Sequence, residues 1–143
     1  MRMRATLVTF AVLFLAAFAE AANDEEVQAR NRGLELAGAF SNDGYKIRDG
    51  HWLGTLKPKV RQLVAVNLYA GNQYWFSAGA NEKVKKIGVE VFDESGQRMP
   101  TEPYSAGEKA AAGFSPTSSG QYFVAVSLME GEAATCCLIY SYK

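Results

Sequence analysis

From residue 61 onward, apolar and polar residues alternate with a period of two, which is the spacing of β-strands that bury one face. Five segments carry this alternation over strand length and are rich in β-branched or aromatic residues. They are residues 61–70, 73–79, 84–92, 120–128 and 135–142. The shared parity predicts one core between two sheets, built on Tyr74, Phe76, Val89, Val91, Tyr122, Val124 and Val126.

Three weaker signals add to this pattern. Residues 45–47 and 52–56 predict a further strand or a hairpin near Asp49-Gly50, and residues 109–116 predict another strand. Short Gly- and Ser-containing turns separate the runs, and no long helical pattern lies between them, so a parallel sheet is disfavoured. The predicted fold class is all-β, an antiparallel, jelly-roll-like β-sandwich of about seven or eight strands. Residues 99–113 are the least regular stretch, and their first half is expected to be a mobile surface loop.

A different pattern precedes the strands. Asn23 or Asp24 can cap a helix, and the acidic residues that follow favour its first turn. Val27, Asn31 and Leu34 recur at helical spacing. Because Gly33 and Gly38 weaken a helix, the helix is expected over roughly residues 24–32, resting on the main domain.

The first residues have the pattern of an export signal. Arg2 and Arg4 precede an apolar run from Leu7 to Phe18, and small residues at Ala19 and Ala21 suit a signal peptidase. The expected organisation is a signal peptide at 1–21, an N-terminal helical arm at 22–43 and a β-sandwich domain at 44–143. The expected location is periplasmic or secreted, with no stable membrane span after cleavage.

Charge excludes one class of function. Without Arg2, Arg4 and Glu20, the expected mature chain carries 13 Lys plus Arg against 14 Asp plus Glu. Only Lys83, Lys85 and Lys86 cluster, so binding of nucleic acid to a basic surface is not expected.

Three spaced motifs lie within the predicted strands. They are Leu68-x-x-Gly71-x-x-Tyr74-x-Phe76-x-Ala78, Val89-x-Val91-x-Asp93-x-x-Gly96, and Phe114-x-Pro116-x-x-Ser119-Gly120-x-Tyr122-x-Val124-x-Val126. Their order resembles the bacterial pre-peptidase C-terminal (PPC) domains, a β-sandwich family, over about residues 45–143. It is most similar to the stand-alone secreted members, in which a short helix comes first. The resemblance implies an accessory role, such as binding or help in the export of a partner, and no catalytic residues.

The chain departs from that family at one position. Related collagen-binding domains hold calcium with acidic residues near the central strand, where this chain has Lys85 and Lys86. Calcium needs six to eight oxygen ligands, and the remaining acids are not spaced to supply them. The prediction is therefore no cofactor and no metal site.

Candidate site residues come from the aromatic side chains. Tyr69 and Trp75 have the parity opposite to the core and are expected on neighbouring strands, and Trp52 is a third candidate. Such rings can lie under the N-terminal helix, contact a protein partner, or stack on a glycan of the cell envelope. His51, the only histidine, has Asp49 nearby but no nucleophile motif, so catalysis through it is not expected.

The two cysteines, Cys136 and Cys137, are adjacent in the last strand. Neighbouring strand residues point to opposite faces, so Cys136 is expected in the core and Cys137 outside it. Three arrangements are open: a buried Cys136 with a free or intermolecularly disulfide-linked Cys137, a vicinal disulfide, or soft-metal and redox chemistry. The first is favoured because a vicinal ring interrupts the strand ladder, and it allows a homodimer.

These observations predict a non-enzymatic, secreted or periplasmic binding or accessory module that engages a protein partner. One alternative is a carbohydrate-binding module that uses its exposed aromatic residues. The other is a redox or metal-binding protein that uses Cys136 and Cys137.

Overall fold

The computed structural model describes residues 24–48 and 52–143, which contain one helical segment and nine strands. Residues 24–41 are helical. The strands are β1 (Lys46–Ile47), β2 (Trp52–Leu56), β3 (Gln62–Leu68), β4 (Tyr74–Ala80), β5 (Val84–Asp93), β6 (Glu102–Ala106), β7 (Lys109–Phe114), β8 (Gly120–Gly131) and β9 (Ala134–Tyr142).

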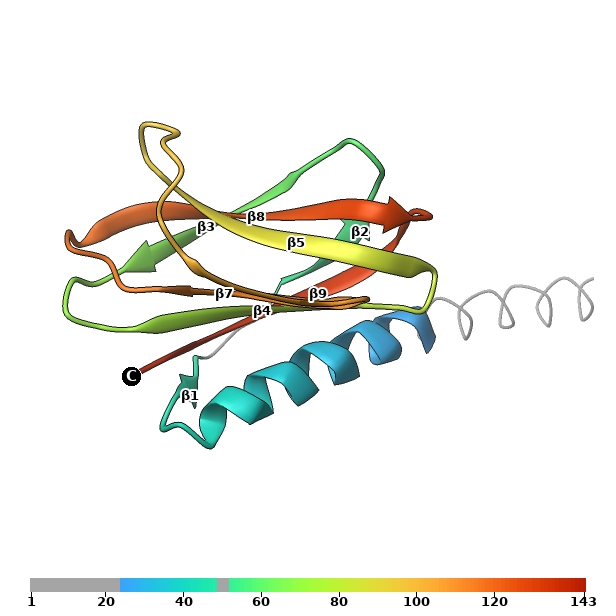
Figure 1. The fold of residues 1–143 in the computed structure, drawn as a ribbon, viewed down its shortest axis with the longest axis horizontal. Helices are drawn as coiled ribbons and strands as arrows, with labels where there is room; N and C mark the ends of the chain where they lie inside the picture. The colour runs from blue at the N-terminus through green and yellow to red at the C-terminus, as the bar shows by residue number, and fades with distance from the viewer. Residues whose placement is uncertain (1–23, 49–51) are drawn as a thin grey trace, which may run out of the picture.

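The strands form two antiparallel sheets that face each other. A six-stranded sheet has the order β1-β9-β4-β7-β6, with β2 also paired to β9, and a three-stranded sheet has the order β3-β8-β5. Figure 1 shows three layers: the three-stranded sheet, the six-stranded sheet, and the helix on the far side of the latter. The predicted antiparallel sandwich preceded by a helix is confirmed.

The core lies between the two sheets and follows the alternation of the sequence. All seven side chains predicted for it are buried, and Phe76, Val91, Val124 and Val126 are completely inaccessible. Phe76 pairs with Ala112 on one side and Tyr140 on the other, at the middle of the larger sheet. Its burial fixes the register, because a slip by one residue would turn every one of these side chains outward.

The helix is longer than the sequence predicted. It continues through Gly33 and Gly38 to residue 41, so the expected end near residue 32 is wrong. Gly33 does not end the helix because it faces the sheet: a Cβ there would lie 3.4 Å from the Ile139 side chain. Tertiary packing, not intrinsic propensity, stabilises this part of the helix.

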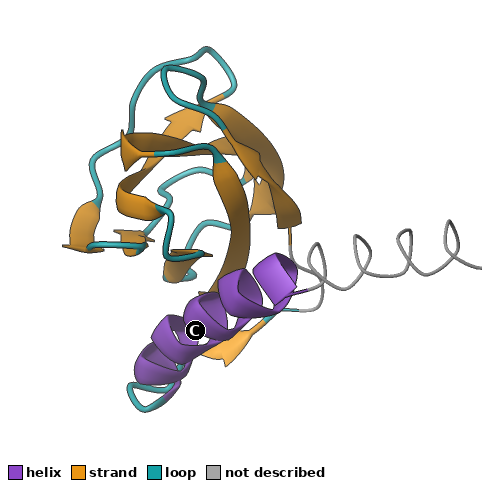
Figure 2. Cartoon of the chain, turned by 90° about the vertical axis from the view of Figure 1, so that its right-hand side faces the viewer, coloured by secondary structure: helices purple, strands orange, loops and turns teal. Residues whose placement is uncertain are grey.

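The helix lies on the outer face of the six-stranded sheet (Figure 2). Its small residues allow a close approach, since a Cβ on Gly79 of β4 would come within 2.3 Å of the Gly33 nitrogen. Three ion pairs join the helix to the strands and turns around it. They are Arg32–Glu108 at 3.3 Å, Lys83–Glu25 at 2.6 Å and Lys109–Glu35 at 3.5 Å.

Two local expectations are corrected by the strand pairing. Of the two alternatives for residues 45–47 and 52–56, the further strand is confirmed and the hairpin is wrong. Both β1 and β2 pair with β9: Ile47 lies opposite Ser141, and Trp52 lies opposite Leu138. Residues 102–106, expected in a mobile loop, form the edge strand β6, in which Tyr104 pairs with Ala111. All five residues of β6 are exposed. Because the strand buries neither face, its sequence shows no alternation of apolar and polar residues from which it could be predicted.

Some expectations lie outside the described residues. The signal peptide at 1–21 is one, and the Asp49, Gly50 and His51 segment is another. Within the part of the chain that the structure describes, no helix is both long and apolar enough to cross a membrane.

Candidate functional site

The three aromatic candidates do not form one site. Trp52 lies on the inner face of the larger sheet and packs against the core. Trp75 lies on the outer face of the same sheet and stacks on Phe40 of the helix, with ring centroids 4.0 Å apart. Tyr69 follows β3 in the other sheet and is 56% exposed. The prediction that Tyr69 and Trp75 lie on neighbouring strands is wrong, because β3 and β4 belong to different sheets.

The two cysteines point to opposite faces, and both thiols are free. Cys136 lies in the core between the sheets, and Cys137 lies on the outer face beneath the helix, among Ala29, Ala37 and Ile139. Both residues are 0% exposed, so the expectation of an accessible Cys137 is wrong. A disulfide between chains through Cys137 would require the helix to leave the sheet.

Burial also makes both thiols poor nucleophiles. It raises the pKa of Cys136 to about 12, and the neighbouring Cys137 adds to that rise. Burial raises the pKa of Cys137 to about 11, although the positive charge of Arg30 acts in the opposite direction. Since the thiolate is the reactive form, this environment opposes redox exchange in the folded chain.

The outer face of the three-stranded sheet presents a different environment. Its central row runs from Ala65 on β3 through Phe123 on β8 to Phe92 on β5, because these residues are register partners. Leu63 of β3 and Met129 of β8 extend the apolar surface and are 59% and 61% exposed. We call this surface, made by Arg61, Leu63, Ala65, Phe92, Phe123 and Met129, the open face.

Charged side chains border the open face. The Arg61 guanidinium lies 5.0 Å from the centre of the Phe92 ring, a cation–π contact. Arg61 and Phe92 line a hollow of about 250 Å³. The other side chains of its lining include Leu63, Phe123 and the acids Asp93 and Glu94. Glu90 forms an ion pair with Arg98 at 3.1 Å farther along β5.

Asp93 fixes the turn at the border of this hollow. One of its carboxylate oxygens accepts hydrogen bonds from the Ser95 hydroxyl at 2.7 Å, the Ser95 backbone N–H at 2.9 Å and the Gln97 N–H at 2.9 Å. These bonds, the one from the Ser95 hydroxyl above all, hold the pKa of Asp93 below its usual value. The Asp93 carboxylate and the Arg61 guanidinium line the same hollow.

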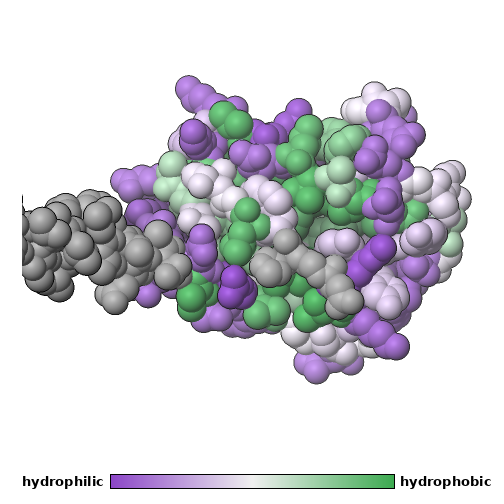
Figure 3. Space-filling view, turned by 180° about the vertical axis from the view of Figure 1, so that it is seen from behind, coloured by the Kyte–Doolittle hydropathy of each residue, from purple (hydrophilic) through white to green (hydrophobic). Residues whose placement is uncertain are grey.

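The two sheets are covered differently. The helix buries the outer face of the larger sheet, whereas none of the described residues forms a layer over the open face (Figure 1). On the side seen from behind, hydrophobic residues are interspersed with hydrophilic ones (Figure 3). Leu63 and Met129 are thus exposed on a sheet that already buries its other face.

Sequence reasoning missed the open face, although a signal was present. Phe123 stands between Tyr122 and Val124, and Phe92 follows Val91, so each strand carries a large apolar residue on its outer face as well as on its inner one. A sandwich strand with a solvated outer face shows strict alternation instead. Large apolar residues on the outer face therefore indicate that this face, like the inner one, packs against another surface.

No metal centre emerges from the described residues. Within them, no three His, Cys, Asp or Glu side chains lie close enough to hold a metal ion. Two buried hydroxyls beneath the helix, those of Ser77 and Ser141, have no hydrogen-bond partner within the described part of the chain.

Comparison with known proteins identifies a fold relative. No protein-family model matches the chain, and no curated protein matches it. The crystal structure of Aeromonas hydrophila PliG, a periplasmic lysozyme inhibitor of g-type lysozyme, superposes with a TM-score of 0.52. This chain shares the fold of PliG. The match covers 71% of this chain and 90% of PliG at 15% sequence identity, so the likeness is one of architecture.

Proposed function

We propose that this chain is an exported, non-enzymatic module that binds a folded protein partner through the open face. The observation that carries the proposal is the exposure of Leu63 and Met129 on a sheet whose outer face no described segment covers. Protein interfaces are enriched in aromatic residues, Met and Arg, and Phe92, Phe123, Met129 and Arg61 match that composition.

Three further observations support the proposal. The leader-like N-terminus and the periplasmic location of PliG agree with export. PliG acts on another protein, a g-type lysozyme, so this architecture can serve an inhibitor. The motif resemblance to stand-alone PPC domains, which we keep as part of this proposal, also implies an accessory partner-binding role.

The alternatives are less well supported. A redox role conflicts with the burial and raised pKa of both thiols. A glycan platform built from Trp52, Tyr69 and Trp75 conflicts with their positions, since the two tryptophans lie on opposite faces of one sheet and Trp75 is stacked on Phe40.

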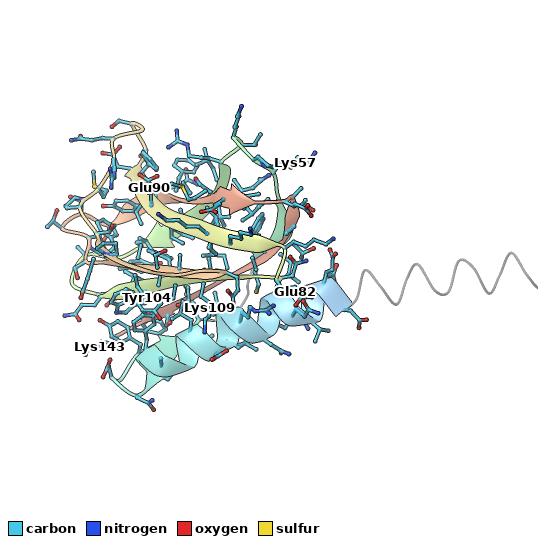
Figure 4. The ribbon with its side chains drawn as sticks, turned by 45° about the vertical axis from the view of Figure 1, so that its right-hand side comes forward. Lys57, Glu82, Glu90, Tyr104, Lys109 and Lys143 are labelled. Atoms are coloured by element: carbon cyan, nitrogen blue, oxygen red, sulfur yellow. The ribbon has the colours of Figure 1, made fainter. Side chains whose placement is uncertain are left out.

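Site-specific photo-crosslinking in the producing cell tests the proposal. A photoreactive residue at Leu63 should yield a discrete adduct with another protein. The same residue at Tyr104, which is 44% exposed on β6 of the other sheet, is the matched control and should yield none (Figure 4). Identical adducts at both positions, or no discrete adduct at Leu63, would contradict the proposal.

The affinity for the captured partner then measures how much the open face contributes to binding. Complete burial of a Leu or Met side chain stabilises a complex by about 1.5–3 kcal/mol. Leu63→Glu should therefore weaken partner binding by about tenfold or more, whereas Tyr104→Glu should not change it. A g-type lysozyme is the first purified partner to assay, by binding and by inhibition of cell-wall lysis.

A further inference from the structure

A second hollow lies where β3 ends, and it shares no lining residue with the hollow of the open face. It has a volume of about 260 Å³ and is lined by Arg48, Tyr69, Asn72, Tyr74 and Tyr142. These residues come from the segment after β1, the β3–β4 turn, the start of β4 and the end of β9. None of them lines the hollow of the open face, so the two sites are independent.

The guanidinium of Arg48 is held in place by the fold. Its Nη1 donates to the Asn67 carbonyl at 3.2 Å, and its central carbon lies 5.6 Å from the centre of the Tyr140 ring. A guanidinium carries five N–H donors in a planar fork that matches a carboxylate. The Asn67 carbonyl uses one of them, and none of the described residues accepts a hydrogen bond from the others.

The hydroxyl of Tyr74 adds a second oriented donor. Its oxygen accepts a hydrogen bond from the Tyr69 backbone N–H at 2.9 Å and another from the Asn72 side-chain amide at 3.1 Å. A phenol oxygen has two lone pairs and one proton. Both lone pairs are occupied, and none of the described residues accepts the proton, so the hydroxyl can donate it from the wall of the hollow while the rest of the Tyr74 side chain is buried in the core. The second N–H of the Asn72 amide is a further donor.

The lining therefore combines donors, one positive charge and aromatic rings. Among its described residues there is no Asp or Glu. Tyr69 and Tyr142 are 56% and 36% exposed, so their rings are accessible to a ligand. The complement of such a surface is a small ring that carries acceptor oxygens and a carboxylate.

We propose that this hollow binds a carboxylated sugar of the uronate class. Arg48 pairs with the carboxylate, Tyr74 and Asn72 donate to ring hydroxyls, and Tyr69 or Tyr142 packs against the apolar face of the sugar ring. The volume lies just below the roughly 300–1,000 Å³ of drug-sized ligand sites, so it suits one sugar unit. This binding is separate from the protein recognition proposed for the open face.

NMR chemical-shift titration of the whole folded chain tests the site with three probes: D-glucuronate, D-glucose and acetate. D-glucuronate should shift the Arg48, Tyr69 and Asn72 resonances at millimolar concentration. D-glucose lacks the carboxylate and loses the charge-assisted contact with Arg48. Acetate keeps that contact but loses the hydrogen bonds and packing of the sugar ring. Each should therefore bind at least about tenfold more weakly. A short oligouronide distinguishes recognition of a polymer from recognition of the free sugar acid.

Variants decide which residues are responsible. Arg48→Gln should weaken D-glucuronate binding by about tenfold or more, and Arg48→Lys, which keeps the charge and loses the fork, should fall between. Tyr69→Ala should also weaken binding, whereas Tyr104→Ala is the control with no effect. Retained amide shifts outside the hollow show that each variant is folded.

The proposal is overturned if D-glucuronate causes no shift at tens of millimolar. It is also overturned if glucose or acetate binds equally well, or if Arg48→Gln binds as the parent does. Leu63→Glu should leave D-glucuronate binding unchanged, so failure of the open face as a partner site would not affect this result.

Discussion

At the scale of single residues, parity along a strand decides the environment of each side chain. Cys136 and Cys137 are neighbours, yet one lies between the sheets and the other lies beneath the helix. Trp52 and Trp75 are separated in the same way by the two faces of the larger sheet. The same rule places Phe76 in the core and Phe123 on the open face.

Truncation of these two phenylalanines should therefore have unequal effects. Phe76→Ala removes a completely buried ring and should lower the free energy of unfolding by about 3–5 kcal/mol. Phe123→Ala, the same change on a partly exposed ring, should cost much less. Urea unfolding of both variants measures the difference, and equal losses would show that the faces of β4 or β8 are wrongly assigned.

Parity was readable from the sequence, which is why the core residues were predicted. The sequence pattern did not show what covers the side chains that point away from the core. Trp75 and Cys137 point away from the inter-sheet core as expected, but a helix from a distant segment of the chain buries them. Alternation specifies which way a side chain points and carries no information on what lies beyond it.

At the scale of elements, the N-terminal helix is the part whose extent the sequence did not reveal. Propensity predicts that Gly33 weakens it, yet Gly33 packs so tightly on the sheet that a Cβ on Gly79 would come within 2.3 Å of its nitrogen. Strand β6 was missed for a related reason, since an exposed edge strand needs no apolar side chain. In both elements tertiary context overrides the local pattern.

The close packing of Gly79 against the helix predicts a substitution that detaches the helix from the sheet. In Gly79→Ala the new methyl would meet the helix backbone at 2.3 and 2.7 Å, so the helix must shift or leave. Cys137 should then react with a thiol reagent in the native state, whereas Cys136 should remain protected by the inter-sheet core. In the parent chain both thiols should react only on unfolding.

Gly38→Ala is the matched control. A Cβ at Gly38 meets nothing within 4 Å, and alanine favours a helix by about 1 kcal/mol over glycine. This variant should keep both thiols protected and unfold at equal or higher denaturant concentration. If Gly79→Ala protects Cys137 as well as the parent does, the helix does not pack against β4 as described.

At the scale of the whole molecule, the sandwich has one sheet covered by its own helix and one sheet with the open face. This asymmetry separates two ways in which chains can associate. Contact through the open face is non-covalent and needs a complementary surface. Association through Cys137 is covalent and needs the helix to be displaced first, because the thiol is fully buried and its pKa is raised to about 11.

The covalent route should therefore be closed in the native parent chain. Incubated with a mild oxidant at neutral pH, the parent should remain a monomer on a non-reducing gel, because a buried protonated thiol neither ionises nor meets a second chain. Gly79→Ala should give a disulfide-linked dimer under the same conditions, and adding Cys137→Ser should abolish that dimer. A dimer of the native parent that Cys137→Ser removes would show that the helix leaves the sheet spontaneously.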